Sequence, residues 1–166
     1  MKYIFSCSLI SYLVLVLVAC QPTGTKTAAS VELTAPSSFV IPDSSLRQIS
    51  APDTLFTNGI RPAQWKLAGF SDPTAFKRFL ALFKDWVVHG QADSITAHIN
   101  FPLAHYKSAA VFKQAYGQVF DSAMKATVLQ QPLNCIFRNY QGAMLGNGEI
   151  WWAELNGQYK IIAINK

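Results

Sequence analysis

The chain has 166 residues, of which 51% are hydrophobic, and 14 Lys and Arg residues against nine Asp and Glu give a formal net charge of +5. Lys77 and Arg78 are the only adjacent basic pair, so no basic patch for nucleic acid is indicated. From this length we expect one domain, with no second independent core.

The first 20 residues have the pattern of an export signal. Lys2 precedes an apolar stretch from Ile4 to Ala19, and at about 16 residues this stretch is shorter than the roughly 20 needed to span a bilayer. It ends in Leu-Val-Ala-Cys at residues 17–20, which resembles the lipobox of bacterial lipoproteins. The resemblance implies a signal peptide of residues 1–19 and a Cys20 that carries diacylglycerol and an N-linked acyl chain such as palmitate. Two acyl chains hold a protein firmly on a membrane.

The residue after the cysteine is Gln21 and not Asp. By the same resemblance, this favours the periplasmic face of the outer membrane. A plain secretory signal and an uncleaved membrane anchor are the alternatives for this segment.

A tether is expected after Cys20. Residues 21–60 contain 12 Ser or Thr and four prolines, with little hydrophobic periodicity. We therefore expect residues 20–55 to form a flexible tether. Residues 56–71 are more apolar, and we expect them to pack on the domain as irregular structure.

The three cysteines leave no disulfide within the mature chain. Cys7 belongs to the signal peptide and Cys20 to the lipid anchor, so Cys135 stays alone. Because it lies in the apolar run of residues 133–137, we expect it to be a small core residue in a strand.

The domain of residues 72–166 begins with helical patterns. Asp72 and Pro73 suit the start of a helix, whose apolar residues recur three and four apart until Gly90. A short helix is expected over residues 93–99, an extended segment over 100–107, and a third helix after Ser108 up to Phe120.

After Pro132 the pattern becomes that of strands. Residues 133–145, 149–155 and 159–165 are expected to form a three-stranded antiparallel meander. Asn147-Gly148 and Asn156-Gly157 suit type I′ turns, in which both central residues need positive φ. We also expect Glu149 to pair with Arg138 across the first hairpin.

The order of these elements resembles the nuclear transport factor 2-like superfamily, a cystatin-like α+β cone. The likeness is carried by residues 79–99, 101–103 and 142–152 and covers about residues 72–166. It implies a curved antiparallel sheet packed on an N-terminal long helix and two further helices, as in small envelope lipoproteins. Enzymes of this superfamily that resemble ketosteroid isomerase use a helix tyrosine, whose place falls near Phe83, and a carboxylate on the first strand. This chain has no Asp or Glu between Asp93 and Asp121, so the carboxylate that those enzymes carry on the first strand is missing here.

The resemblance therefore favours binding without catalysis. The expected function is that of a membrane-anchored envelope lipoprotein whose cone binds a protein partner or a small apolar ligand, with no cofactor and no nucleic acid. Residues expected to line the cone are Phe79, Phe83, Tyr116, Phe137 and Trp151 or Trp152. No metal is expected, since the three histidines lack the spacing of a metal site.

An isomerase or dehydratase is the alternative function. His105 borders the expected mouth of the cone, where it would act as a base while Tyr116 or Arg138 polarises the substrate. Without a catalytic role, His105 would simply be a half-exposed polar residue at a strand end.

Two adjacent tryptophans, Trp151 and Trp152, place a large aromatic side chain on each face of one strand. One of them is expected to fill the cone. The other would be covered by Phe56, Trp65 or Phe70, by a second subunit in a homodimer, by an envelope protein or by a ligand, or be left exposed.

Overall fold

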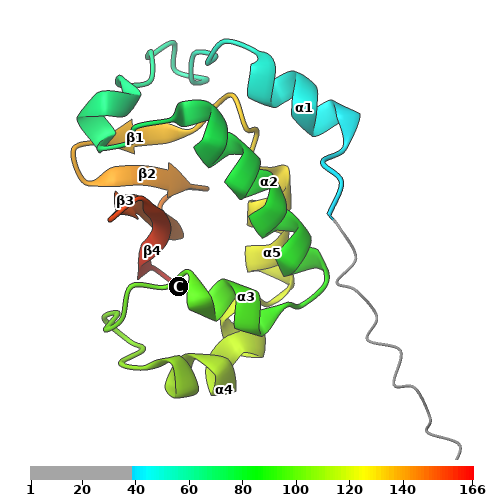
Figure 1. The fold of residues 1–166 in the computed structure, drawn as a ribbon, viewed down its shortest axis with the longest axis vertical. Helices are drawn as coiled ribbons and strands as arrows, with labels where there is room; N and C mark the ends of the chain where they lie inside the picture. Colours follow the sequence, from blue (N-terminus) through cyan, green and yellow to red (C-terminus); the bar gives the residue numbers. More distant parts are fainter. Residues whose placement is uncertain (1–38) are drawn as a thin grey trace, which may run out of the picture. The chain divides into compact units, whose positions relative to one another are not determined.

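A computed structural model describes residues 39–166, which form one compact unit with an α+β fold (Figure 1). The predicted signal peptide, the lipidation site Cys20 and the first part of the predicted tether lie outside the described residues. Within residues 39–166, every helix is too short or too polar to cross a bilayer.

The sheet is an antiparallel meander of four strands in the order β1-β2-β3-β4. The strands are β1 (Phe137–Asn139), β2 (Gly142–Leu145), β3 (Ile150–Leu155) and β4 (Gln158–Ile164). The prediction of three strands was wrong, because a turn at residues 140–141 divides the expected strand of residues 133–145. Asn139 closes this turn by accepting a hydrogen bond from the Gln141 amide at 2.8 Å.

Only one of the two predicted type I′ turns is confirmed by positive φ at both central residues. Asn156 and Gly157 have φ of 52° and 71°. In the turn between β2 and β3, positive φ occurs at Gly146 and Gly148, while the Asn147 amide donates to the Glu149 carboxylate at 2.5 Å. The predicted pairing of Glu149 with Arg138 is therefore also wrong, and Arg138 lies opposite Ala143 in the register.

The three predicted helices are present. Asp72 caps the long helix α2 (Pro73–Val88) by accepting from the Ala75 amide at 2.9 Å. Ser108 caps α4 (Ala109–Val119) in the same way through the Val111 amide at 3.4 Å. Between them lies α3 (Ala92–Ala97). The caps read from the sequence thus mark the two longer helices correctly.

Three further helical elements were not predicted: α1 (Asp43–Ser50), the 3₁₀ helix η1 (Trp65–Ala68) and α5 (Ser122–Gln130). The α1 helix falls in the segment that we expected to be tether, yet Ile49 is buried in the core and Gln48 accepts from the Leu133 amide at 2.8 Å. The fold prediction made α2 the N-terminal helix of the fold. That was wrong, because α1 precedes it.

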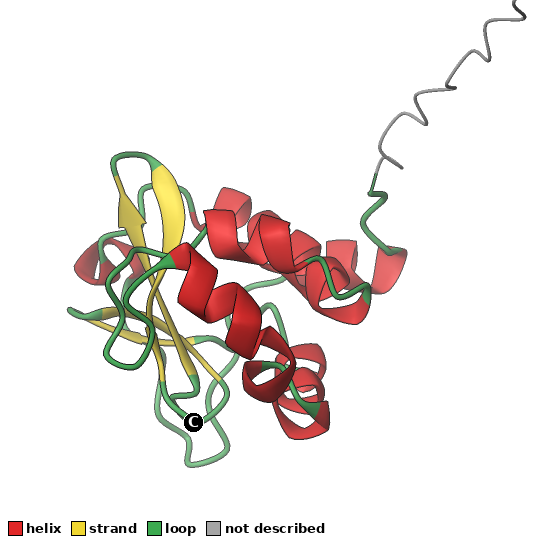
Figure 2. Ribbon diagram, turned by 90° about the horizontal axis from the view of Figure 1, so that it is seen from below, coloured by secondary structure: helices red, strands yellow, loops and turns green. Residues whose placement is uncertain are grey.

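The helices α2 to α5 lie on one side of the sheet (Figure 2). The core between these layers contains Trp152 from β3 and Phe76 and Phe83 from α2. Residues 100–107, expected to be extended, contribute no strand. Just before them, a parallel bridge joins Ile99 to Ile161 at the outer edge of β4.

Candidate functional site

The interior expected to bind a ligand is occupied by the protein's own aromatic side chains. Phe83 is fully buried, with its ring 4.8 Å from that of Trp152. Phe79 lies 5.3 Å from Trp152, and Tyr116 lies 5.1 Å from Phe120. Burial raises the pKa of Tyr116, and its hydroxyl has no hydrogen-bond partner within the described residues. These side chains form a packed core rather than an open cavity.

The remaining expected lining residues lie on the other face of the sheet. Trp152 is 1% exposed and faces the helices, so Trp151 points to the outer face, where it is half-exposed. Phe137 is aligned with Met144, which in turn pairs with Trp151, and its ring is 6.3 Å from Trp151. The five expected residues are therefore divided between two faces and cannot line one cavity.

The segment before α2 covers this outer face only in part. Phe56 contacts Phe137, with ring centroids 5.8 Å apart. Trp65 and Phe70, the other two expected covering residues, pack instead against Phe76 on the helix side, at 5.7 and 4.4 Å. Trp151 is consequently left beside an open pocket.

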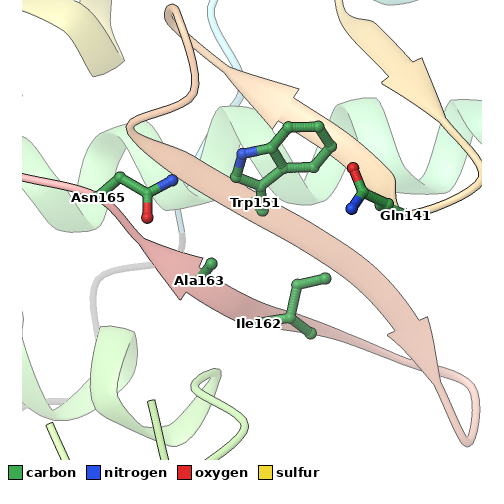
Figure 3. Close-up of a pocket in the computed structure, with 5 residues that line it drawn as sticks. All are labelled: Gln141, Trp151, Ile162, Ala163 and Asn165. Atoms are coloured by element: carbon green, nitrogen blue, oxygen red, sulfur yellow. The ribbon is translucent and has the colours of Figure 1, made fainter. Parts of the chain in front are cut away.

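This pocket of about 250 Å³ lies on the outer face of β3 and β4 and is lined by Gln141, Trp151, Ile162, Ala163 and Asn165 (Figure 3). A register shift explains its shape. Trp151 pairs with Ala163 but Trp152 pairs with Ile161, so Ile162 is an extra residue in β4. Such a bulge redirects side chains, and here it places Ile162 and Ala163 together beside the indole.

Two amide side chains flank the indole in Figure 3. The Asn165 amide nitrogen donates to the Gly148 carbonyl at 2.7 Å, which leaves its oxygen unused by the described residues. Gln141 accepts weakly from Asn139 at 3.4 Å, and its amide nitrogen donates to no described residue. The Trp151 indole nitrogen likewise donates to no described residue. The pocket thus offers an apolar ring, hydrogen-bond donors and an acceptor, and none of its lining residues is charged.

The groups suggested for catalysis are placed apart. His105 is exposed in the segment before α4, and its ring contacts Tyr106. Arg138 is buried on the helix side of β1 and is engaged by Asp53. In residues 39–166, no three His, Cys, Asp or Glu side chains gather closely enough to hold a metal ion. Cys135 was expected in a buried strand, but it is half-exposed and precedes β1.

A buried charge cluster is the most elaborate electrostatic feature of the described residues. Asp53 lies 2.7 Å from the Lys77 ammonium and 2.7 Å from the Arg138 guanidinium, and it accepts from the Trp65 indole at 2.8 Å. The Arg138 guanidinium also stacks 4.0 Å above the Trp65 ring. Side-chain exposure is 6% for Lys77, 4% for Arg138 and 20% for Asp53.

The cluster stabilises the ionised form of Asp53. Burial by itself raises the pKa of this carboxyl group. Hydrogen bonds from Lys77 and Trp65, together with the charges of Arg138 and Lys77, outweigh burial and hold the pKa below its usual value. Because the four side chains bind one another, we interpret the cluster as structural. It attaches the segment before α2 to α2 and β1. The sequence gives no signal for it, since Asp53 and Arg138 are 85 residues apart.

No family model, curated protein or solved structure matches this chain.

Proposed function

We propose that this chain is a lipid-anchored protein of the bacterial envelope and that it acts by binding rather than by catalysis. The residues that support the anchor are Leu-Val-Ala-Cys at positions 17–20, after an apolar stretch too short to span a bilayer comfortably. Acylated Cys20 would hold the domain at the periplasmic face of the outer membrane.

The proposed fold family is the nuclear transport factor 2-like superfamily. It is supported by the order of the elements from α2 onward, in which a long helix is followed by shorter helices and then by an antiparallel meander that packs on them. Helix α1 and the irregular segment of residues 100–107 are departures from the expected pattern.

One observation carries the binding proposal: the two tryptophans of β3 have opposite surroundings. Trp152 fills the space where a ligand of the cone would sit, while Trp151 stands half-exposed beside a pocket on the outer face. Exposed aromatic side chains in a pocket with a few polar groups are typical of binding surfaces. We therefore assign the binding function to the Trp151 pocket rather than to the interior.

The alternative, an enzyme with His105 as base, has less support. It requires an open cone in which the imidazole reaches a substrate. Phe83 and Trp152 occupy that space, and Arg138, proposed to polarise the substrate, is already engaged by Asp53.

Membrane fractionation tests the anchor. In a Trp151→Ala background, which removes the proposed binding surface, replacing Cys20 by Ala should release the protein from the membrane fraction, because the acyl chains supply the attachment. Cys135→Ala in the same background is the matched control and should stay in the membrane fraction. A Trp151→Ala/Cys20→Ala protein that remains on the membrane after its signal peptide has been removed would contradict the anchor.

Retention on isolated cell envelopes tests the binding surface. The Cys20→Ala protein should bind to washed envelopes, and adding Trp151→Ala should abolish this binding. Val111→Ala, which truncates an exposed apolar side chain on α4, should leave it unchanged. Equal retention of the Trp151 and Val111 variants would refute the proposed surface.

A further inference from the structure

We infer that the ligand of the Trp151 pocket is a neutral carbohydrate chain. This inference rests on the proposed function and names the chemistry of its ligand. It is carried by the composition of the pocket, in which one indole, two aliphatic side chains and two amides occur without any charged residue.

The apolar part of the pocket suits the C–H face of a sugar ring. The face of an aromatic ring carries negative charge density and the C–H bonds of a pyranose point weakly positive hydrogens outward, so the two attract. Ile162 and Ala163 of β4 lie next to the Trp151 indole (Figure 3). They extend the apolar wall beyond the ring.

The polar part of the pocket suits hydroxyl groups, which both donate and accept hydrogen bonds. Gln141 and Asn165 flank the indole, and each has at least one amide atom that no described residue uses. The indole nitrogen of Trp151 adds a further donor. Donors and an acceptor around one apolar surface match a ring that alternates C–H bonds and hydroxyls.

The size of the pocket and its lack of charge narrow the ligand class. About 250 Å³ is below the roughly 300–1,000 Å³ of pockets that enclose drug-sized molecules, so it accommodates one ring of a longer chain. A phosphate-bearing lipid headgroup or an acidic glycan would find no cation among the lining residues, and desolvating its charge there would be unfavourable.

Backbone contacts and hydrogen bonds hold the segments that carry Gln141 and Asn165 in place. Gly142 follows Gln141 with φ of 139°, and a Cβ atom there would lie 2.1 Å from the Trp152 carbonyl oxygen. The backbone therefore approaches β3 closely at the point where Gln141 leaves the sheet. Asn165 is fixed by two hydrogen bonds, from its backbone amide to the Glu149 carbonyl at 2.9 Å and from its side chain to Gly148. The Asn165 side-chain amide is thus positioned before a ligand arrives, which lowers the entropic cost of binding, whereas only the backbone of Gln141 is held in place.

The test uses the full chain in detergent micelles and a panel of neutral oligosaccharides, including chitohexaose, cellohexaose and maltohexaose, with polygalacturonate as the acidic comparison. At least one neutral chain should shift the indole N–H resonance of Trp151 in ¹H–¹⁵N spectra, while the resonance of buried Trp152 moves less. Gln141→Glu, an exposed position whose side chain makes only a weak contact, should weaken the binding by about tenfold or more. Val111→Ala should leave it unchanged.

Two results would overturn the inference. One is the absence of a Trp151 shift with every neutral oligosaccharide, and the other is binding of polygalacturonate alone. The envelope assay separates this failure from failure of the proposed function. If retention depends on Trp151 but is lost after protease treatment of the envelopes and persists in excess oligosaccharide, the partner is a protein, so the binding surface stands and the carbohydrate does not.

Discussion

Replacing Asp53 by Asn isolates the contribution of the buried charge cluster. The substitution keeps the shape of the side chain but removes the negative charge between Lys77 and Arg138, each 2.7 Å away. An asparagine accepts hydrogen bonds through one oxygen only, and its amide group turns a donor toward a cation. Two nearly buried cations would then be left without a counter-ion.

The expected cost is about 3 kcal/mol at pH 7. Removing one partner of a buried ion pair destabilises a protein by roughly 3–5 kcal/mol. We take the lower end because Asp53 itself is 20% exposed and partly solvated. For a domain of this size, that loss corresponds to a Tm lower by about 10 °C.

Urea unfolding followed by circular dichroism measures the difference, and Asp93→Asn is the matched control. Asp93 also pairs with a lysine, Lys113, but their side chains are 87% and 47% exposed. An exposed pair of this kind contributes below about 1 kcal/mol. Asp53→Asn should therefore be several times more destabilising than Asp93→Asn.

The contribution of Asp53 to the free energy of unfolding should decrease in acid. Because the pKa of Asp53 in the folded protein lies below its ordinary value of 3.8, its contribution is fully present above pH 4 to 5. It is lost as the pH falls through the folded pKa. The difference between wild type and Asp53→Asn should thus be constant from pH 7 to 5 and shrink in stronger acid. Equal stability of the two proteins at pH 7, or a difference that persists unchanged in strong acid, would refute this reasoning.

Two further predictions concern a backbone contact and a buried amine. Gly142→Ala should destabilise the protein by more than about 2 kcal/mol in urea unfolding, because its φ is strained for alanine and the new Cβ atom meets the Trp152 carbonyl. Gly117→Ala in α4, where nothing lies within 4 Å, should instead be neutral or stabilising. Burial lowers the pKa of Lys84 to about 8, so its ¹³C resonance should titrate near pH 8 and stability should rise from there to pH 10.5. A midpoint above 10 would contradict that assignment.

The parts of the fold that could be predicted are those with local signals. Helices α2 and α4 begin at Asp72 and Ser108, whose side chains cap them as expected. Helix α5 has an equally good signal in Asp121, which accepts from the Met124 amide at 3.0 Å. It was missed because the apolar pattern of α4 ends immediately before it. Helix α1 has only Ile49 buried, so its sequence is hard to distinguish from a tether.

The candidate site was only partly predictable, because it depends on tertiary geometry. The alternation of a strand indicates that Trp151 and Trp152 face opposite sides, but not which of them faces the core. The bulge at Ile162 arises from the register of β3 and β4, and no local pattern encodes that register. The partner of Arg138 was wrongly predicted for the same reason: a neighbouring strand was considered, whereas Asp53 approaches from a distant segment.

The two edges of the sheet also bear on self-association. At β4 the backbone of residues 98–100 covers the outer edge at Ile161, since the Ile161 amide donates to His98 at 2.7 Å and its carbonyl accepts from Asn100 at 2.9 Å. At the other edge β1 has only three residues, and Thr54 donates to Asn134 just before it. Covered or very short edges resist the addition of strands from other molecules. Copies held side by side by the proposed lipid anchor would therefore find little backbone to pair with at β1 or at the middle of β4.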